Sequence, residues 1–263
     1  MKIQYASDLH LDLYDYELHK PNDVFARLIV PVGDVLLLAG DIGSVRLLRA
    51  FFAYVSRLLQ RVFFVCGCSE YYRSSHVPCV GSTADCSAVR PRSIEAMNEA
   101  IAALCQKFDN VHFLNNDAME CGDVVFIGST LWSHILPSQT AMVANVMEEY
   151  ACVESSQGVG LLDAERPRSG SITPSDTMRL FRRNIAWLKF VLAKYSQRRV
   201  VLLTHHAPSL CLLGEEHASA FGVDVSCAYA SPLEPFLSRY RNIEAWVCGR
   251  VHRSAAYLIF KIK

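Results

Sequence analysis

Short runs of apolar residues recur along the chain, each of a length that suits a strand better than a helix. The most telling are residues 34–39, 61–66, 200–204 and 245–248. Continuous apolar runs are typical of strands buried on both faces, whereas a strand with one wet face alternates. Apolar residues at helical spacing over 45–60 separate the first two runs, so strand, helix and strand form a βαβ unit with parallel pairing. The pattern predicts an α/β fold.

The remaining elements are weaker but consistent with this class. We expect further strands at 3–5, 111–114 and 124–127, a last apolar run at 255–262, and helices at 94–108, 139–150, 173–194 and from 231. Two of these helices begin with a capping pattern, Thr173-Pro174-Ser175-Asp176 and Ser231-Pro232-Leu233-Glu234. Irregular lid or flap segments are expected near 71–92 and 133–172. With no linker and no repeat, residues 1–263 are predicted to form one domain.

Composition limits the class of protein. Of the 263 residues, 26 are Lys or Arg and 26 are Asp or Glu, so the formal net charge is zero, which argues against a broad nucleic-acid surface. No apolar run reaches the ~18 residues that a membrane helix needs, so no membrane insertion is expected. Ten cysteines without an export signal indicate reduced thiols, mostly buried. These features predict a cytoplasmic protein.

Five of the expected strands end in side chains that can bind metals or anions. They are followed by Asp8 and His10, by Asp41, by Cys68 to Glu70, by His205 and His206, and by Arg250 and His252. Ligands of open α/β sheets lie at the carboxyl ends of the strands, and in a parallel sheet these ends share one edge. Carboxylate and imidazole groups together suit ions such as Zn, Mn or Fe. We therefore expect these groups to converge.

The ordered blocks resemble those of the calcineurin-like metallophosphoesterase family, and the resemblance covers nearly the whole chain. The family has Asp-x-His, Gly-Asp, Gly-Asn-His-Asp/Glu, a His after a late strand, and Gly-His-x-His. The corresponding stretches here are Asp8-Leu9-His10, Gly40-Asp41, Gly67-Cys68-Ser69-Glu70, Thr204-His205-His206-Ala207-Pro208 and Gly249-Arg250-Val251-His252. The resemblance implies a four-layer α/β/β/α sandwich. It also implies two adjacent metals that share the Gly-Asp carboxylate and activate water for attack on a phosphate ester.

The resemblance implies a complete first metal site and an incomplete second one. By position, Asp8, His10, Asp41 and His252 match the first metal site, which is therefore complete. Asp41 and His205 match half of the second site. Since only eleven residues follow His252, where family members continue with further strands, the second sheet is expected to lack its last strands.

The other half of the second site departs from the family pattern. Cys68 stands where the family has a ligating Asn, Ser69 where it has the His that acts on the leaving group, and Arg250 where it has another ligand. Arg stays protonated and cannot ligate a cation, so an inward Arg250 would repel a second ion and could instead clamp a phosphate. Cys68 could bind a soft ion as thiolate or be a small buried thiol. His206 either lines the pocket or hydrogen-bonds the neighbouring loop.

These substitutions predict one divalent ion per chain (Mn, Fe, Zn or similar) and a reduced rate. A positioned general acid is worth roughly 10²–10⁴ in rate, and Ser69 is a far poorer proton donor than His. Loss of the second ion's charge would remove roughly another 10²–10⁴. Weak hydrolysis of activated esters is compatible with this site, with His206, Arg250 and Ser69 as the catalytic candidates.

Two hypotheses remain open from the sequence. The first is a divergent metal-dependent phosphoesterase acting on a phosphate-ester small molecule or a phosphorylated substrate, as a phosphomonoesterase or a phosphodiesterase. The second is a catalytically inactive scaffold that keeps the fold and binds a protein partner. A pocket filled by Arg250 and residues 71–92 would favour the scaffold.

Overall fold

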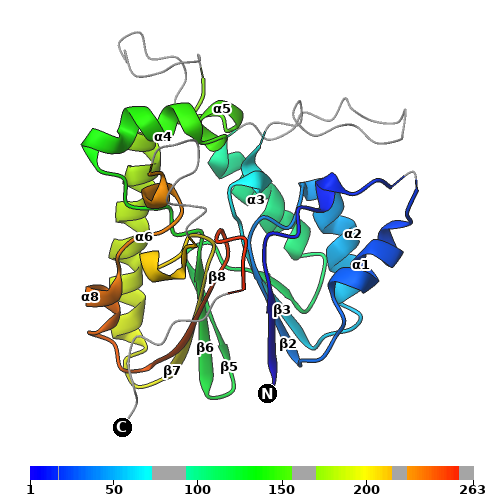
Figure 1. The fold of residues 1–263 in the computed structure, drawn as a ribbon. Coiled ribbons are helices and arrows are strands. Elements are labelled where there is room, and N and C mark those ends of the chain that lie inside the picture. The colour runs from blue at the N-terminus through cyan, green and yellow to red at the C-terminus, as the bar shows by residue number, and fades with distance from the viewer. Residues whose placement is uncertain (17, 73–92, 156–169, 215–223, 255–263) are drawn as a thin grey trace.

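The computed structural model describes residues 1–16, 18–72, 93–155, 170–214 and 224–254 (Figure 1). Most of the lid expected at 71–92, the middle of the flap expected at 133–172, and the apolar run at 255–262 lie outside the described residues. Among the described residues, no helix combines the length and the apolar character that a membrane crossing requires.

The eight strands of the described residues form two sheets of four. The first sheet is parallel throughout, in the order β1 (Ile3–Ala6), β2 (Val35–Ala39), β3 (Arg61–Val65) and β4 (Val111–Phe113). The second has the order β5 (Asp117–Cys121), β6 (Val124–Ser129), β7 (Arg199–Thr204) and β8 (Ile243–Cys248). Strand β5 is antiparallel to β6, and the other pairs are parallel. The strand ends expected at one sheet edge therefore belong to two sheets.

Helices cover the outer face of each sheet (Figure 1). On the first sheet lie α1 (Pro21–Leu28), α2 (Val45–Val55) and α3 (Ile94–Cys105). On the second lies the long α6 (Pro174–Lys194), and the shorter α4 (Thr140–Val146) and α5 (Glu149–Cys152) cross the top of α6 beyond the strand ends, while α8 (Glu234–Leu237) precedes β8. The predicted four-layer α/β/β/α sandwich is confirmed.

Both faces of the central strands are buried, which explains their continuous apolar sequences. Leu37 and Phe63 belong to a core shared with Phe126 and Leu203 of the second sheet, and the rings of Phe63 and Phe126 stack at 4.5 Å. Their neighbours along the strands, such as Leu36, join the core beneath the helices instead. Successive side chains of these strands point to opposite faces, yet all of them are apolar because both faces are buried.

Several helix boundaries differ from the expectations. The capping box of Thr173 and Asp176 begins α6 as predicted. The single helix expected at 139–150 is two helices, because the backbone of Met147 is extended between α4 and α5. The helix start predicted at Ser231 is wrong. The Ser231 hydroxyl accepts the His134 N–H at 2.8 Å, and α8 begins only at Glu234.

Candidate metal centre

The loops that follow β1 and β2 are fastened to each other and carry three of the expected ligands. The N–H of Asp8 donates to the Gly40 carbonyl, and that of His10 donates to the Asp41 carbonyl, each at 3.0 Å. All three ligand residues adopt left-handed backbone angles, with φ of 53° at Asp8, 43° at His10 and 54° at Asp41. Left-handed conformations are costly for residues other than glycine and are concentrated at functional sites.

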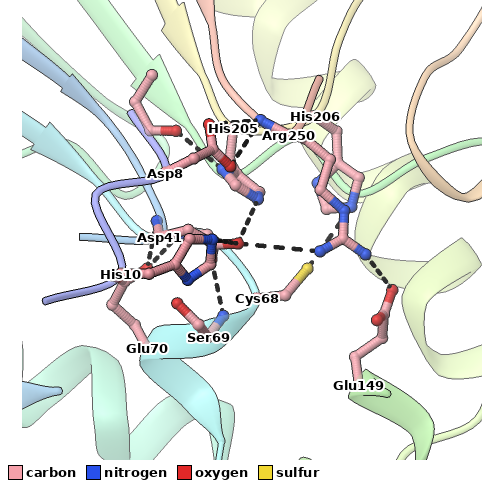
Figure 2. A network of polar contacts seen from close by, with 12 residues as sticks. Asp8, His10, Asp41, Cys68, Ser69, Glu70, Glu149, His205, His206 and Arg250 are labelled. Atoms are coloured by element: carbon pink, nitrogen blue, oxygen red, sulfur yellow. Dashed lines mark hydrogen bonds and ion pairs between the residues drawn. The ribbon is translucent and has the colours of Figure 1, made fainter. Parts of the chain in front are cut away.

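Asp41 is the hub of the site (Figure 2). Its side chain is only 2% exposed, and Oδ1 accepts the Ser69 N–H at 2.8 Å. Three cationic or titratable groups face Oδ2: His205 Nε2 at 3.4 Å, Arg250 Nη1 at 3.9 Å and His10 Nε2 at 4.0 Å. Burial alone would raise the pKa of this carboxyl, but His205 and Arg250 outweigh it and hold the pKa well below the ordinary value of 3.8. Asp41 is therefore an anion.

Glu70 holds the loop that presents Asp41. Its buried Oε1 accepts the N–H groups of Ile42 at 2.7 Å and Gly43 at 3.1 Å, and Oε2 accepts those of Asp41 at 3.0 Å and Gly67 at 2.6 Å. Four backbone donors in two loops thus share one carboxylate, so the ends of β2 and β3 are fixed relative to each other.

The loop after β8 brings the second sheet to the same place. The Arg250 N–H donates to both carboxylate oxygens of Asp8, at 3.2 and 3.1 Å, and His252 Nε2 lies 3.3 Å from Asp8 Oδ1. Arg250 and His252 are again left-handed, with φ of 66° and 49°. Gly249 permits the approach, because a Cβ there would lie 2.5 Å from the Ala39 carbonyl oxygen.

The two histidines after β7 are buried and differ in role. His205 Nδ1 lies 2.8 Å from the carbonyl oxygen of Ala39, which can only accept, so Nδ1 carries a proton. Its Nε2 faces Asp41 at 3.4 Å and has no hydrogen-bond partner in the part of the chain that the structure describes. His206 lies with Nδ1 3.4 Å from the Thr130 carbonyl and Nε2 3.8 Å from Cys68 Sγ, and burial lowers its pKa well below 6.5.

One group of ligand atoms is close enough to share an ion. Asp8, His10, Asp41 and His252 each offer an atom, and these atoms all lie within 4.8 Å of one another. Two carboxylates and two imidazoles form a donor set suited to Mn, Fe or Zn. The buried Nε2 of His205 points at the Oδ2 atom of Asp41 as well. The residues present therefore fit a divalent ion.

The opposite side of Asp41 is occupied by protein groups. Cys68 is fully buried and its thiol pKa is raised to about 11, chiefly by burial, so the thiol is protonated at neutral pH and unfavourable as a ligand. The Ser69 hydroxyl oxygen has no hydrogen-bond partner among the described residues. Arg250 is 5% exposed and donates from Nη2 to Glu149 Oε1 at 2.8 Å (Figure 2).

Sequence reasoning missed Glu149 and Glu70's function. Glu149 belongs to the four-residue helix α5 and to no motif, so only its burial beside Arg250 identifies it. Glu70 ends the stretch Gly67-Cys68-Ser69-Glu70, but that pattern does not indicate that its carboxylate accepts four backbone N–H groups.

Comparisons with known proteins agree with this architecture. No protein family model matches the chain. The uncharacterized protein L509 of Acanthamoeba polyphaga mimivirus is 26% identical over 283 residues, which cover 97% of this chain and 86% of that protein. The crystal structure of phosphopantetheinyl hydrolase (PptH) from Mycobacterium tuberculosis has a TM-score of 0.64 at 16% identity, covering 97% of this chain and 85% of that one. A dimetal phosphatase from Danio rerio has a TM-score of 0.45 at 11% identity, covering 96% and 82%.

The likeness to PptH is one of fold. At 16% identity it shows that the chain shares the architecture of a hydrolase over nearly its full length. Together with the four-layer sandwich, this supports a metallophosphoesterase-like fold, and the cluster at Asp41 supports a divalent metal.

Proposed function

We propose that this protein is a metal-dependent phosphoesterase that uses one divalent ion, held by Asp8, His10, Asp41 and His252. The observation that carries the proposal is the convergence of these four ligand atoms within 4.8 Å, from loops of both sheets. All four residues also have left-handed backbone conformations, which are strained and are concentrated at functional sites.

The side chains around the ion would orient the reaction. A bound divalent ion supplies Lewis-acid chemistry, because it offsets charge on a phosphoryl group and makes nearby water more acidic. Asp41 stays ionised, and the His205 ring is oriented by its bond to the Ala39 carbonyl. His10 and His252 are 31% and 52% exposed, so a phosphate ester would approach from their side.

Proton delivery to the leaving group is the weak part of this site. Ser69 has the position that the family gives to a His, and a hydroxyl is a poor acid. His206 is buried and its pKa is lowered, so its ring is neutral at pH 7 and is a poor proton donor. We therefore expect slow turnover that improves with leaving groups needing no protonation, such as p-nitrophenolate.

The test combines metal analysis with hydrolysis. Metal content per chain is measured for the purified protein, and hydrolysis of p-nitrophenyl phosphate and bis(p-nitrophenyl) phosphate is followed with added Mn²⁺; a phosphopantetheinyl ester, named for PptH, joins the substrate panel. We expect about one ion per chain, and loss of both ion and turnover in Asp41→Asn. The matched control Asp109→Asn changes an exposed carboxylate and should retain both. Two ions per chain with strong turnover would contradict the one-ion site.

A scaffold that binds a protein partner is the second candidate. The observation that favours it is the buried Arg250–Glu149 ion pair beside Asp41, together with the protonated thiol of Cys68. Bound metal without turnover, or no bound metal, would support the scaffold.

A further inference from the structure

The guanidinium of Arg250 is held from two sides. Nη2 donates to Glu149 Oε1 at 2.8 Å, and the guanidinium carbon lies 5.0 Å from the centre of the Tyr229 ring. The side chains of Arg250 and Glu149 are 6% and 2% exposed. A buried ion pair of this kind keeps one geometry, because separating the charges would leave each of them uncompensated.

The held guanidinium still has donors to offer. Nη1 lies 3.9 Å from Asp41 Oδ2, beyond hydrogen-bond distance, and among the described residues Nε has no hydrogen-bond partner. Oε2 of Glu149 likewise has no partner within the described part of the chain. The planar guanidinium presents donors along two edges, Nε with Nη2 and Nη1 with Nη2, so an anion beside Asp41 would be bound by Nη1.

The charge of the pair matters as much as its donors. A bound divalent ion would offset the carboxylates of Asp8 and Asp41, whereas Glu149 offsets Arg250. A second divalent ion in place of this pair would leave the same site with two further positive charges. The pair therefore offers a phosphoryl group a hydrogen-bond donor but no net charge, which suits a doubly charged anion less well than a second ion would.

We propose that the Arg250–Glu149 pair takes the place of a second cation and makes the site selective for a singly charged phosphodiester over a doubly charged phosphomonoester. This inference rests on the proposed function and names its substrate class. Arg250 would contact a phosphoryl oxygen through Nη1, and Glu149 is a positioning residue that also cancels its charge.

Two variants separate the effect of the pair's charge from that of its hydrogen-bond donors, and a third serves as a control. Glu149→Gln keeps an oxygen that can accept from Nη2 but adds one positive charge to the site. The double variant Arg250→Met and Glu149→Gln restores the wild-type net charge without the donors, and it avoids leaving a buried carboxylate unpaired. Arg199→Met with Glu244→Gln removes an exposed pair of the same kind and serves as the matched control.

The measurement is binding by calorimetry, with inorganic phosphate at pH 8, mostly a dianion, and dimethyl phosphate, a monoanion, as probes. Because attraction scales with ligand charge, we expect Glu149→Gln to tighten phosphate binding about tenfold and dimethyl phosphate by clearly less. Loss of the donors in the double variant should weaken both about 10- to 100-fold. If Glu149 had only a structural role, Glu149→Gln would instead weaken the binding of both probes by the same factor.

The proposal is overturned if Glu149→Gln leaves the ratio of the two affinities unchanged or weakens both, if the double variant binds as the wild type does, or if no protein binds either probe. Thermal melting of each variant verifies that it is folded. Failure of the proposed function would look different, since the wild-type protein would then lack metal and turnover whatever its preference between the probes.

Discussion

The loop that carries Asp41 depends on one buried carboxylate, and replacing Glu70 by Gln tests this dependence. The amide of Gln has one accepting oxygen, so two of the four backbone N–H groups now bound by Glu70 would face an NH₂ group. Each buried donor left without an acceptor costs roughly 1–3 kcal/mol. We therefore expect the free energy of unfolding to fall by about 2–6 kcal/mol, a large part of the ~5–15 kcal/mol typical of a domain.

Urea unfolding of the metal-free protein, followed by tryptophan fluorescence, measures this loss independently of metal binding. Glu99→Gln is the matched control, because Glu99 is exposed in the middle of α3 and should change stability by less than about 0.5 kcal/mol. If Glu70→Gln unfolds within about 1 kcal/mol of the wild type, the four hydrogen bonds do not hold the loop and the reasoning is refuted.

Two further predictions concern the surroundings of Asp41. The pKa of His206 is lowered by burial, so the folded protein resists protonation of this ring and loses stability as the pH falls below the unfolded pKa of about 6.5. Between pH 7.5 and 5, the free energy of unfolding of the metal-free protein should therefore fall less in His206→Gln than in the wild type. An equal fall in both proteins would contradict this. Gly67→Ala would place a Cβ 2.2 Å from Asp41 Oδ1, so metal content should fall while Gly122→Ala, where nothing lies within 4 Å, retains its metal.

Much of the architecture follows from the sequence because the central strands are buried on both faces. The apolar runs at 34–39, 61–66 and 200–204 locate β2, β3 and β7 to within a residue or so. Strand β5 was missed because its sequence, Asp-Ala-Met-Glu-Cys, is that of a partly exposed edge strand with acidic residues. An edge strand is defined by its pairing with β6, which local sequence does not reveal.

The candidate site was predictable where residues follow strands and unpredictable where tertiary packing decides. The candidate metal ligands lie in motifs, and the structure brings Asp8, His10, Asp41 and His252 together. The assignments of His205, His206, Cys68, Ser69 and Arg250 to binding or catalysis remain predictions. Glu149 could not be foreseen, because a break at Met147 turns a short helix inward, and no pattern in 139–150 announces that break.

The site joins the two ends of the chain, since the Arg250 N–H donates to Asp8 across 242 residues. Contacts of such large sequence separation form slowly because a long loop must close first. During synthesis, which proceeds from the N-terminus, Asp8, His10 and Asp41 emerge early and have no partner from the second sheet until β7, which brings His205 to Asp41, and then β8 have been made and have docked. Until then the left-handed turns that carry them must be held by contacts among the loops of the first sheet, such as those of Glu70.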